Sequence, residues 1–309
     1  MNIVIVVLNY NDWETTKTFL HRVSSYKSVS NIVIVDNCST DDSVLQLKPC
    51  CVNNIKLVTS DKNNGYAAGN NLGVKYAFTQ CDADVIIISN PDISIKEADI
   101  KKIVAPLNSG FGMSTGLIYN YDKVENQRSL ASNFGWKIPN YWQMLTNCFL
   151  ILYKLARLTN RGIYLNYDQH KSEKWIHTEA VPGCFFAITT DALKQIGYFD
   201  EDTFLFGEET ILGWKLKEQK INVCVVNDTE ILHENSVSIN KSIKQSNKKI
   251  QYLLHSELLY LRKYLKCGAV RCRIFKSAFS IGIIEKKVIR YLFGKNKHTR
   301  NSIGGIYEN

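Results

Sequence analysis

Two adjacent acidic residues, Glu208 and Glu209, begin a stretch of helical periodicity directly after the apolar letters FLFG. A carboxylate beside apolar side chains can act as a general base, because it can take the proton of a hydroxyl group while that hydroxyl attacks a substrate. The alternative needs no chemistry, since the helix dipole favours acids in a first helical turn. The pair is therefore a candidate catalytic site, with helix-start electrostatics as the other interpretation.

A third acid, Asp92, ends the segment SNPD and stands two residues after Asn90. A hard divalent cation that bridges a diphosphate often needs only one or two protein carboxylates, because phosphate and water oxygens complete its shell. An ordinary Asn-Pro-Asp turn is the alternative. His233, in the segment LHENS, stands at the end of another apolar run, and a lone histidine is more often structural than a ligand.

Two polar loops could hold a nucleotide. Asp36 ends the string IVIVD, where its carboxylate could accept from a ribose hydroxyl or a base N–H, or could cap the next helix. The segment NNGYAAGNN, residues 63–71, offers a turn, small residues and several amides. It is not G-x-G-x-x-G, and the chain contains no G-x-x-x-x-G-K-[ST] loop. A dinucleotide fingerprint and a phosphate-hydrolysing loop are therefore not indicated.

Apart from the glutamate pair, each of these segments follows or ends a short apolar run that predicts a strand. Strands are predicted at 3–8, 31–36, 55–59 and 85–89, with helices near 13–26 and 67–78 between them. This alternation predicts βαβ units, and ligands of such sheets bind at the carboxyl ends of the strands. We therefore expect an α/β fold with a Rossmann-like, mostly parallel sheet and flanking helices. Later elements are predicted as strands over 111–119, 183–189 and 222–226 and helices over 208–218 and 141–158, the last one over a site or at an interface.

Composition excludes several classes of protein. The 309 residues are 45% apolar, with only 17 Gly and 5 Pro, which excludes disorder for most of the chain and collagen-like structure. No apolar run reaches the 18 or more residues of a membrane span, and the first run predicts a strand, not a signal peptide. The nine cysteines form no C-x-x-C pair, so we expect buried reduced thiols and a cytoplasmic location.

Positive charge is concentrated in the last 70 residues. Residues 240–309 contain 16 Lys or Arg against 3 acids, whereas the whole chain carries only +9. Apolar residues at helical spacing predict two amphipathic helices there, with Leu254, Leu258, Leu261 and Leu265 in the first and Ile274, Ala278, Ile281, Val288 and Leu292 in the second. These helices could pack on the rest of the chain, pair with another subunit, or dock on an anionic membrane. Nucleic acid is not expected as a partner, because aromatic stacking motifs are not evident among the basic residues.

Taken in order, seven segments resemble the family 2 glycosyltransferases of the GT-A fold, particularly the rhamnosyltransferase-like branch of bacterial surface polysaccharide synthesis. The segments are VVLNYN, VDNCSTD, NNGYAAGNN, SNPD, PGCFFAI, GYFDEDTFLFGEE and LHENS. The resemblance covers about residues 1–238 and implies a GT-A nucleotide-diphospho-sugar transferase fold. It implies a catalytic domain over 1–240, with a nucleotide-binding half (1–92) and an acceptor-binding half (93–240), before a basic helical tail over 241–309.

The resemblance also implies an inverting enzyme. It would move a sugar from a nucleoside diphosphate donor, dTDP-rhamnose or a UDP-hexose, to a hydroxyl of a glycan such as a lipid-linked O-antigen or capsule precursor. A catalytically inactive nucleotide-sugar-binding homologue is the alternative. The tail would hold the enzyme as a peripheral protein on the inner face of the cell membrane, and a homo-oligomer is a further option.

Individual roles follow from the same resemblance. Glu209 would be the catalytic base, with Glu208 beside it in place of the family's Glu-Asp pair. Asp92 would be the main protein ligand of Mg²⁺ or Mn²⁺, because Asn90 replaces the first carboxylate of the D-x-D motif. His233 would help to hold the metal or the diphosphate. The residues that would bind the donor are Asn9, Tyr10, Asn11, Asp36, Asn64, Gly65, Asn70 and Asn90.

Overall fold

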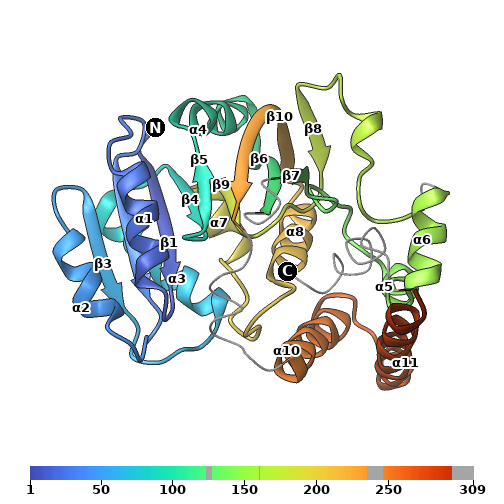
Figure 1. Cartoon of the computed structure of the whole chain (residues 1–309). Coiled ribbons are helices and arrows are strands. Elements are labelled where there is room, and N and C mark those ends of the chain that lie inside the picture. The colour runs from blue at the N-terminus through green and yellow to red at the C-terminus, as the bar shows by residue number, and fades with distance from the viewer. Residues whose placement is uncertain (123–126, 160, 235–245, 294–309) are drawn as a thin grey trace.

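A computed structural model of the chain describes residues 1–122, 127–159, 161–234 and 246–293 (Figure 1). Within these ranges, ten strands form one mixed sheet in the order β3-β2-β1-β4-β9-β6-β10-β5, with β7 paired to β6 and β8 paired to β10. The strands are β1 (Ile3–Asn9), β2 (Asn31–Asp36), β3 (Ile55–Thr59), β4 (Val85–Ser89), β5 (Ile93–Ile95), β6 (Phe111–Asp122), β7 (Gln127–Leu130), β8 (Trp175–Thr178), β9 (Phe185–Thr189) and β10 (Asn222–His233).

The first four strands form the parallel part of the sheet. β1 lies between β2 and β4 and β2 lies beside β3, all parallel. This confirms the predicted βαβ units. The other part is mixed, because β9 runs antiparallel to both β4 and β6, whereas β10 runs parallel to β6 and antiparallel to β5. Strands from residues 1–92 and from residues 93–240 therefore share one sheet, and the division into two halves stays a prediction.

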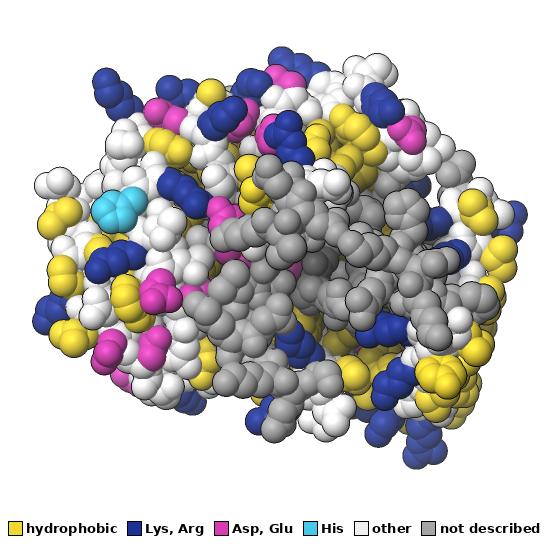
Figure 2. Space-filling model, in the orientation of Figure 1, with side chains coloured by type: hydrophobic (Ala, Val, Ile, Leu, Met, Phe, Trp, Pro, Cys, Tyr) yellow, Lys and Arg dark blue, Asp and Glu magenta, His cyan; other side chains and the backbone are white. Residues whose placement is uncertain are grey.

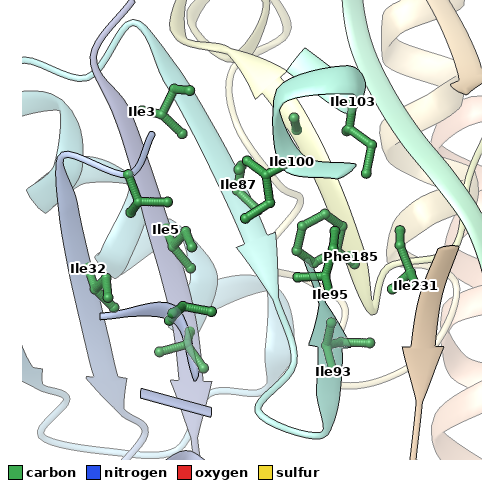
Figure 3. Packing of buried hydrophobic residues seen from close by; sticks show 14 of the residues in the cluster. Ile3, Ile5, Ile32, Ile87, Ile93, Ile95, Ile100, Ile103, Phe185 and Ile231 are labelled. Atoms are coloured by element: carbon green, nitrogen blue, oxygen red, sulfur yellow. The ribbon is translucent and has the colours of Figure 1, made fainter. Parts of the chain in front are cut away.

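Helices cover both faces of this sheet. They are α1 (Trp13–Val23), α2 (Ser43–Leu47), α3 (Tyr66–Cys81), α4 (Glu97–Val104), α5 (Tyr141–Asn147), α6 (Leu150–Leu158), α7 (Thr190–Ile196), α8 (Glu208–Glu218), α10 (Ser246–Leu259) and α11 (Ala269–Phe293). Alternate residues of β1 enter different clusters. Ile3 and Ile5 share one with residues of α1 and with Ile100 and Ile103 of α4, which Figure 3 shows on the same side of the sheet. Val4 and Val6 share another with residues of α3. Burial on both faces explains why the strand is apolar throughout.

The predicted helix over 141–158 is two helices. α5 begins with a capping box, in which Asn140 Oδ1 accepts from Gln143 N and Gln143 Oε1 accepts from Asn140 N. α6 begins three residues after α5 ends, and its first N–H groups are capped from the other end of the chain. Glu285 of α11 accepts hydrogen bonds from the N–H groups of Leu150 (2.9 Å) and Ile151 (3.2 Å).

The tail packs on the body of the molecule. A π-helical turn, η4 (Tyr260–Tyr264), continues α10. Buried Tyr260, Leu261 and Phe275 share one cluster with Ile211 of α8 and Tyr141 of α5. The predicted stripe of leucines at 254, 258, 261 and 265 therefore faces the protein, and the packing alternative is correct for this first tail helix.

Candidate functional site

The two adjacent glutamates lie at the N-terminus of α8, beside the loop that precedes β9. Glu209 Oε1 accepts a hydrogen bond from the Gly183 N–H at 3.3 Å. Glu208 is 4% exposed, and its Oε1 has no hydrogen-bond partner among the described residues. Burial raises the pKa of both carboxyl groups, and for Glu208 the charge of Glu209 raises the pKa further. Glu208 is therefore the member of the pair whose charged form is the less favoured, and Glu209, which has an N–H partner, is the better candidate for the base.

Gly183 is the residue that lets Glu209 approach the backbone. A Cβ atom at position 183 would lie 2.5 Å from Glu209 Oε1, closer than real Cβ atoms come to other heavy atoms. Tyr66, at the start of α3, holds the same loop: its hydroxyl donates to the Gly183 carbonyl oxygen at 2.8 Å and lies 3.3 Å from Asn90 Oδ1. Tyr66, which follows β3, therefore contacts both Asn90, which follows β4, and Gly183, which holds Glu209.

The candidate metal residues lie at the neighbouring end of the sheet. β5 pairs with the end of β10, and this places His233 Nε2 3.4 Å from Asp92 Oδ2. Asp92 is 4% exposed; its Oδ1 and the Nε2 of His233 have no hydrogen-bond partner among the described residues. Two orphaned ligand atoms suit a divalent cation. The described residues contain no group of three or more His, Cys, Asp or Glu that could hold a metal, so donor phosphate oxygens would have to complete the shell.

Asn9 and Asp36, predicted to hold the nucleoside, lie inside the protein. Asn9 Nδ2 donates to Asp36 Oδ1 at 2.8 Å, and Ser39 donates to both carboxylate oxygens, through Oγ at 2.6 Å and through N at 2.9 Å. Both predicted side chains are buried, so what they hold in this structure is the loop after β2. Sequence reasoning missed Ser39, although the quoted letters DNCSTD contain it.

Tyr10 and Asn11 lie at the surface end of this network. Both are half-buried, and Asn11 Oδ1 accepts from the Thr40 N–H at 2.7 Å. Asn11 also has a positive φ of 53°. Asparagine is one of the few non-glycine residues that adopt such a conformation readily. The loops after β1 and β2 are therefore fastened to each other at the carboxyl ends of their strands.

The segment before α3 contacts the loop that leads to the catalytic pair. Gly65 has φ +93°, and a Cβ there would lie 2.2 Å from the Phe204 carbonyl oxygen, so only glycine fits. That oxygen accepts from Tyr66 N at 2.8 Å. Asn64 is exposed, whereas Asn70 is fully buried and donates to the Tyr66 carbonyl oxygen at 3.0 Å. Asn64 could meet a ligand directly, and Asn70 supports the first turn of α3.

Asn37 and Asn71 hold these loops and were missed from the sequence. Asn37 Nδ2 donates to Asn63 Oδ1 (3.1 Å) and to the Gly65 carbonyl oxygen (3.2 Å). Asn71 accepts from Phe199 N and donates to Glu201 Oε1 at 2.8 Å. Both asparagines stand in the quoted segments DNCSTD and NNGYAAGNN, but their partners are distant in sequence.

The tail contacts the loop 200–207, which leads to Glu208, and so does the segment before α3. Lys263 Nζ lies 2.8 Å from a carboxylate oxygen of Asp200 and 2.8 Å from one of Asp202, and Tyr264 donates to Asp200. Phe204 stacks on Tyr252 of α10 with ring centroids 4.5 Å apart. Burial alone would raise the pKa of Asp200, but the hydrogen bonds from Lys263 and Tyr264 outweigh it and lower that pKa. The loop before Glu208 is therefore held between α3 and the tail.

Residues 4–197 match the protein family described as Glycosyl transferase family 2. A curated relative is 23% identical over 295 residues, which are 94% of this chain and 85% of the relative: the low-salt glycan biosynthesis hexosyltransferase Agl10 of Haloferax volcanii. These matches confirm the resemblance to the family 2 glycosyltransferases, and the rhamnosyltransferase-like branch stays a prediction.

Solved glycosyltransferase structures share the fold. GalNAc-T7 with UDP, GalNAc and Mn²⁺ aligns with a TM-score of 0.62 at 14% identity, over 95% of this chain and 58% of that one. This chain therefore spans little more than half of the GalNAc-T7 chain. The mannosyltransferase PcManGT from Pyrobaculum calidifontis, in complex with GDP-Man and Mn²⁺, aligns with a TM-score of 0.58 at 11% identity, over 99% of this chain and 84% of that one.

Proposed function

Because this chain belongs to glycosyl transferase family 2 and is a glycosyltransferase of the GT-A fold, we propose that it transfers a hexose from a nucleoside diphosphate to a glycan hydroxyl with inversion at the anomeric carbon. The observation that carries this proposal is the position of Glu209. Glu209 lies in the first turn of α8, and its carboxylate accepts from the Gly183 N–H. Burial raises its pKa, as a base that works near neutral pH requires.

The reaction that suits this geometry is a direct displacement. As the acceptor oxygen forms its bond to the anomeric carbon, its proton passes to Glu209 and the bond from that carbon to the diphosphate oxygen breaks. Attack on the face opposite the leaving group inverts the configuration, and one base is enough because no covalent intermediate forms. Burial and the neighbouring charge of Glu209 raise the pKa of Glu208, which makes Glu208 the weaker candidate for the ionised base.

Asp92 and His233 would hold Mg²⁺ or Mn²⁺ together with the donor diphosphate. The bound cation would neutralise the negative charge that develops on the departing diphosphate. The orphaned atoms Asp92 Oδ1 and His233 Nε2 support this assignment. The structures of GalNAc-T7 with UDP, GalNAc and Mn²⁺ and of PcManGT with GDP-Man and Mn²⁺ support it as well.

For the substrates we propose dTDP-rhamnose or a UDP-hexose as donor and a lipid-linked O-antigen or capsule precursor as acceptor. The hexosyltransferase Agl10 supports a sugar donor of this size, and a structure of S. aureus TarS with UDP-GlcNAc supports a nucleotide-linked one. The donor would lie over the segments that follow β1, β2, β3 and β4. Tyr10, Asn11, Asn64 and Asn90 could contact it there, while the buried Asn9, Asp36 and Asn70 would shape those loops beside Gly65.

The variant Glu209→Gln tests the proposal, because it keeps the shape of the side chain and removes the base. We expect turnover of the accepted nucleotide sugar to fall by roughly 100-fold or more. A nucleoside diphosphate should still raise the melting temperature of the variant, since ligand that binds only the folded state stabilises it. Near wild-type turnover in Glu209→Gln, with the loss in Glu208→Gln instead, would reassign the base. Stabilisation by donor without product from any sugar would favour the inactive homologue.

A further inference from the structure

The helix α11 has apolar side chains on two opposite sides. Cys272, Phe275 and Phe279 are buried against the body of the molecule. Because successive residues turn by about 100°, a second set of apolar residues points away from these. This outer set is exposed and comprises Val270, Ile274, Ile281, Ile284, Val288, Tyr291 and Leu292. Packing on the protein therefore accounts for one side of α11, and the described residues leave the other apolar side uncovered.

The helix α6 repeats this arrangement. Leu150 and Tyr153 are buried and pack with Ile289 of α11. The other apolar side chains of α6 are exposed, and Leu158 is 81% exposed: Ile151, Leu152, Leu155 and Leu158. The spacing of these four residues places them on one side of the helix. Two helices from distant parts of the chain thus each carry an exposed apolar stripe.

Direct contacts fix α6 beside α11. Glu285 caps the N-terminus of α6 through the N–H groups of Leu150 and Ile151. At Gly282 a Cβ would lie 2.0 Å from the Cys148 carbonyl oxygen, so α11 passes very close to the junction of α5 and α6. We call the exposed apolar residues of the two helices the α6–α11 face. Figure 2 shows hydrophobic side chains gathered with Lys and Arg where these two helices lie in Figure 1.

The charge around this face is almost entirely positive. Residues 269–293 contain six Lys or Arg and one acid, and that acid is Glu285, which is engaged in capping α6. Arg273, Lys276 and Lys287 are exposed along one flank of the outer stripe. The helix α6 adds two cations and no acid: Lys154 and Arg157. A partner that fits must therefore offer apolar groups below a layer of negative charge.

Two aromatic side chains stand at the margin of the face. Trp142 of α5 is 67% exposed and Tyr291 of α11 is 86% exposed. Trp142 and Leu155 also line a cavity of about 330 Å³ between α5 and α6. Rings with an apolar body and a polar tip are typical of side chains at the level of lipid headgroups.

We propose that the α6–α11 face docks on an anionic phospholipid bilayer. The outer stripes of both helices enter the headgroup boundary, and the flanking cations meet lipid phosphates. A second copy of this chain fits less well, because it would bring the two sets of cations together. This proposal deepens the proposed function: it names the surface on which a lipid-linked acceptor would be met, and it relies on that function only for the acceptor.

Sedimentation of the full-length protein with lipid vesicles tests the proposal. We expect binding to phosphatidylcholine vesicles that contain phosphatidylglycerol, at low salt, and much weaker binding to phosphatidylcholine alone. The double variant Leu155→Asp/Ile284→Asp should lower the partition coefficient by about tenfold or more, and so should Arg273→Gln/Lys287→Gln. Matched controls lie on the other side of the molecule, where Leu45→Asp on α2 and Lys27→Gln/Lys48→Gln should leave binding unchanged. All these positions are exposed, and unchanged melting temperatures would show that each variant is folded.

Three results would overturn the docking proposal: equal binding to neutral and anionic vesicles, equal loss in the control variants, or a wild-type dimer that Leu155→Asp/Ile284→Asp converts to a monomer. The last result would assign the face to a second copy of the chain. Failure of the proposed function can be distinguished from failure of membrane docking. Transfer to a soluble acceptor needs no vesicles, and Glu209→Gln should bind vesicles like the wild type.

Discussion

At the scale of single residues, the two glutamates of α8 differ in what surrounds their carboxyl groups. Glu209 meets an N–H group and is partly exposed, whereas Glu208 is buried beside a like charge. Burial raises the pKa of Glu209 above the ordinary 4.5, so its basic form is lost on acidification at a higher pH than for an exposed glutamate. The contribution of this raised pKa to folding stability is present at pH values below the pKa of Glu209 in the unfolded chain. It decreases as pH rises through the higher pKa of Glu209 in the folded protein.

We therefore expect kcat/KM to rise with pH along an acid limb whose midpoint lies above 4.5. Glu208→Gln should keep this limb, because Glu209 is the proposed base and is held by the Gly183 N–H, and Glu209→Gln should remove it. The measurement is the pH profile of transfer at limiting substrate for the three proteins. A profile without an acid limb in the wild type, or an unchanged limb in Glu209→Gln, would contradict the assignment of the base.

Asp92 leads to a second prediction, on metal removal. With two protein ligand atoms and phosphate oxygens as the rest of the shell, we expect weak binding of the cation without donor. Excess EDTA should abolish transfer, and added Mn²⁺ or Mg²⁺ should restore it. Asp92→Asn should raise the Mn²⁺ concentration needed for half-maximal activity by about tenfold or more, because an amide is a weaker ligand than a carboxylate.

The matched control for Asp92→Asn is Asp82→Asn. Asp82 is exposed and has a left-handed backbone, which asparagine also tolerates. Its substitution should leave the metal requirement unchanged. Full activity of the wild type in excess EDTA would rule out the metal site.

At the scale of elements, the tail and the loop 200–207 act on each other through Asp200. Lys263 and Tyr264 of η4 hold this carboxylate, and their hydrogen bonds lower its pKa. The stability they supply is therefore present above the unfolded pKa of Asp200 and is lost as pH falls through the folded pKa. The same loop leads to Glu208 and Glu209, so a loosened tether should misplace the base without removing it.

The double variant Lys263→Met/Tyr264→Phe tests this coupling. We expect kcat to fall by about tenfold or more, because small misplacements of a reacting group are costly. Stabilisation by nucleoside diphosphate should persist, since the loops after β1 and β2 are untouched. Arg262→Met is the matched control from the same helical turn: its side chain is exposed, and substitution should leave kcat unchanged. Equal losses in the control and the double variant would show that η4 serves folding only.

Whole strands were predictable where a short run of residues is strongly apolar and is followed by a polar turn. The observed bounds of β2, β3, β4 and α8 agree with the sequence prediction. The strands β5, β7 and β8 were missed, because three or four residues contain too little periodicity to distinguish a strand from a loop. The sequence also predicted one helix over 141–158 where two occur, since the capping of α6 depends on Glu285, far along the chain.

The site was predictable as a set of segments but not as a set of contacts. Resemblance singled out Glu208, Glu209, Asp92 and His233, and the structure brings each pair together; their chemical roles stay predictions. The role of Tyr66 was not predictable, because its hydroxyl bonds to Gly183, 117 residues away. Nor does the sequence indicate that the side chains of Asn9 and Asp36 are buried in a network with Ser39, since that network depends on how two loops meet.

At the scale of the whole molecule, the α6–α11 face and the tether at Asp200 belong to one packed unit. Helix α11 buries Phe275 and Phe279 in the cluster that also contains Ile211 of α8 and Tyr260 of η4. One cluster of packed side chains therefore connects α11 with the helix that carries Glu208 and Glu209. Removal of residues 241–309 would uncover this cluster, so a truncated chain should not be taken as an isolated catalytic domain.

The order of strands in the sheet also has a consequence for how the chain folds. The edge strand β5 pairs with β10, and these two strands are more than a hundred residues apart in sequence. Asp92 meets His233 only through that pairing, so a nascent chain that has not yet emerged from the ribosome as far as β10 lacks the pair. Pairings between such distant segments form slowly. Contact between Asp92 and His233 is therefore expected to form late in folding.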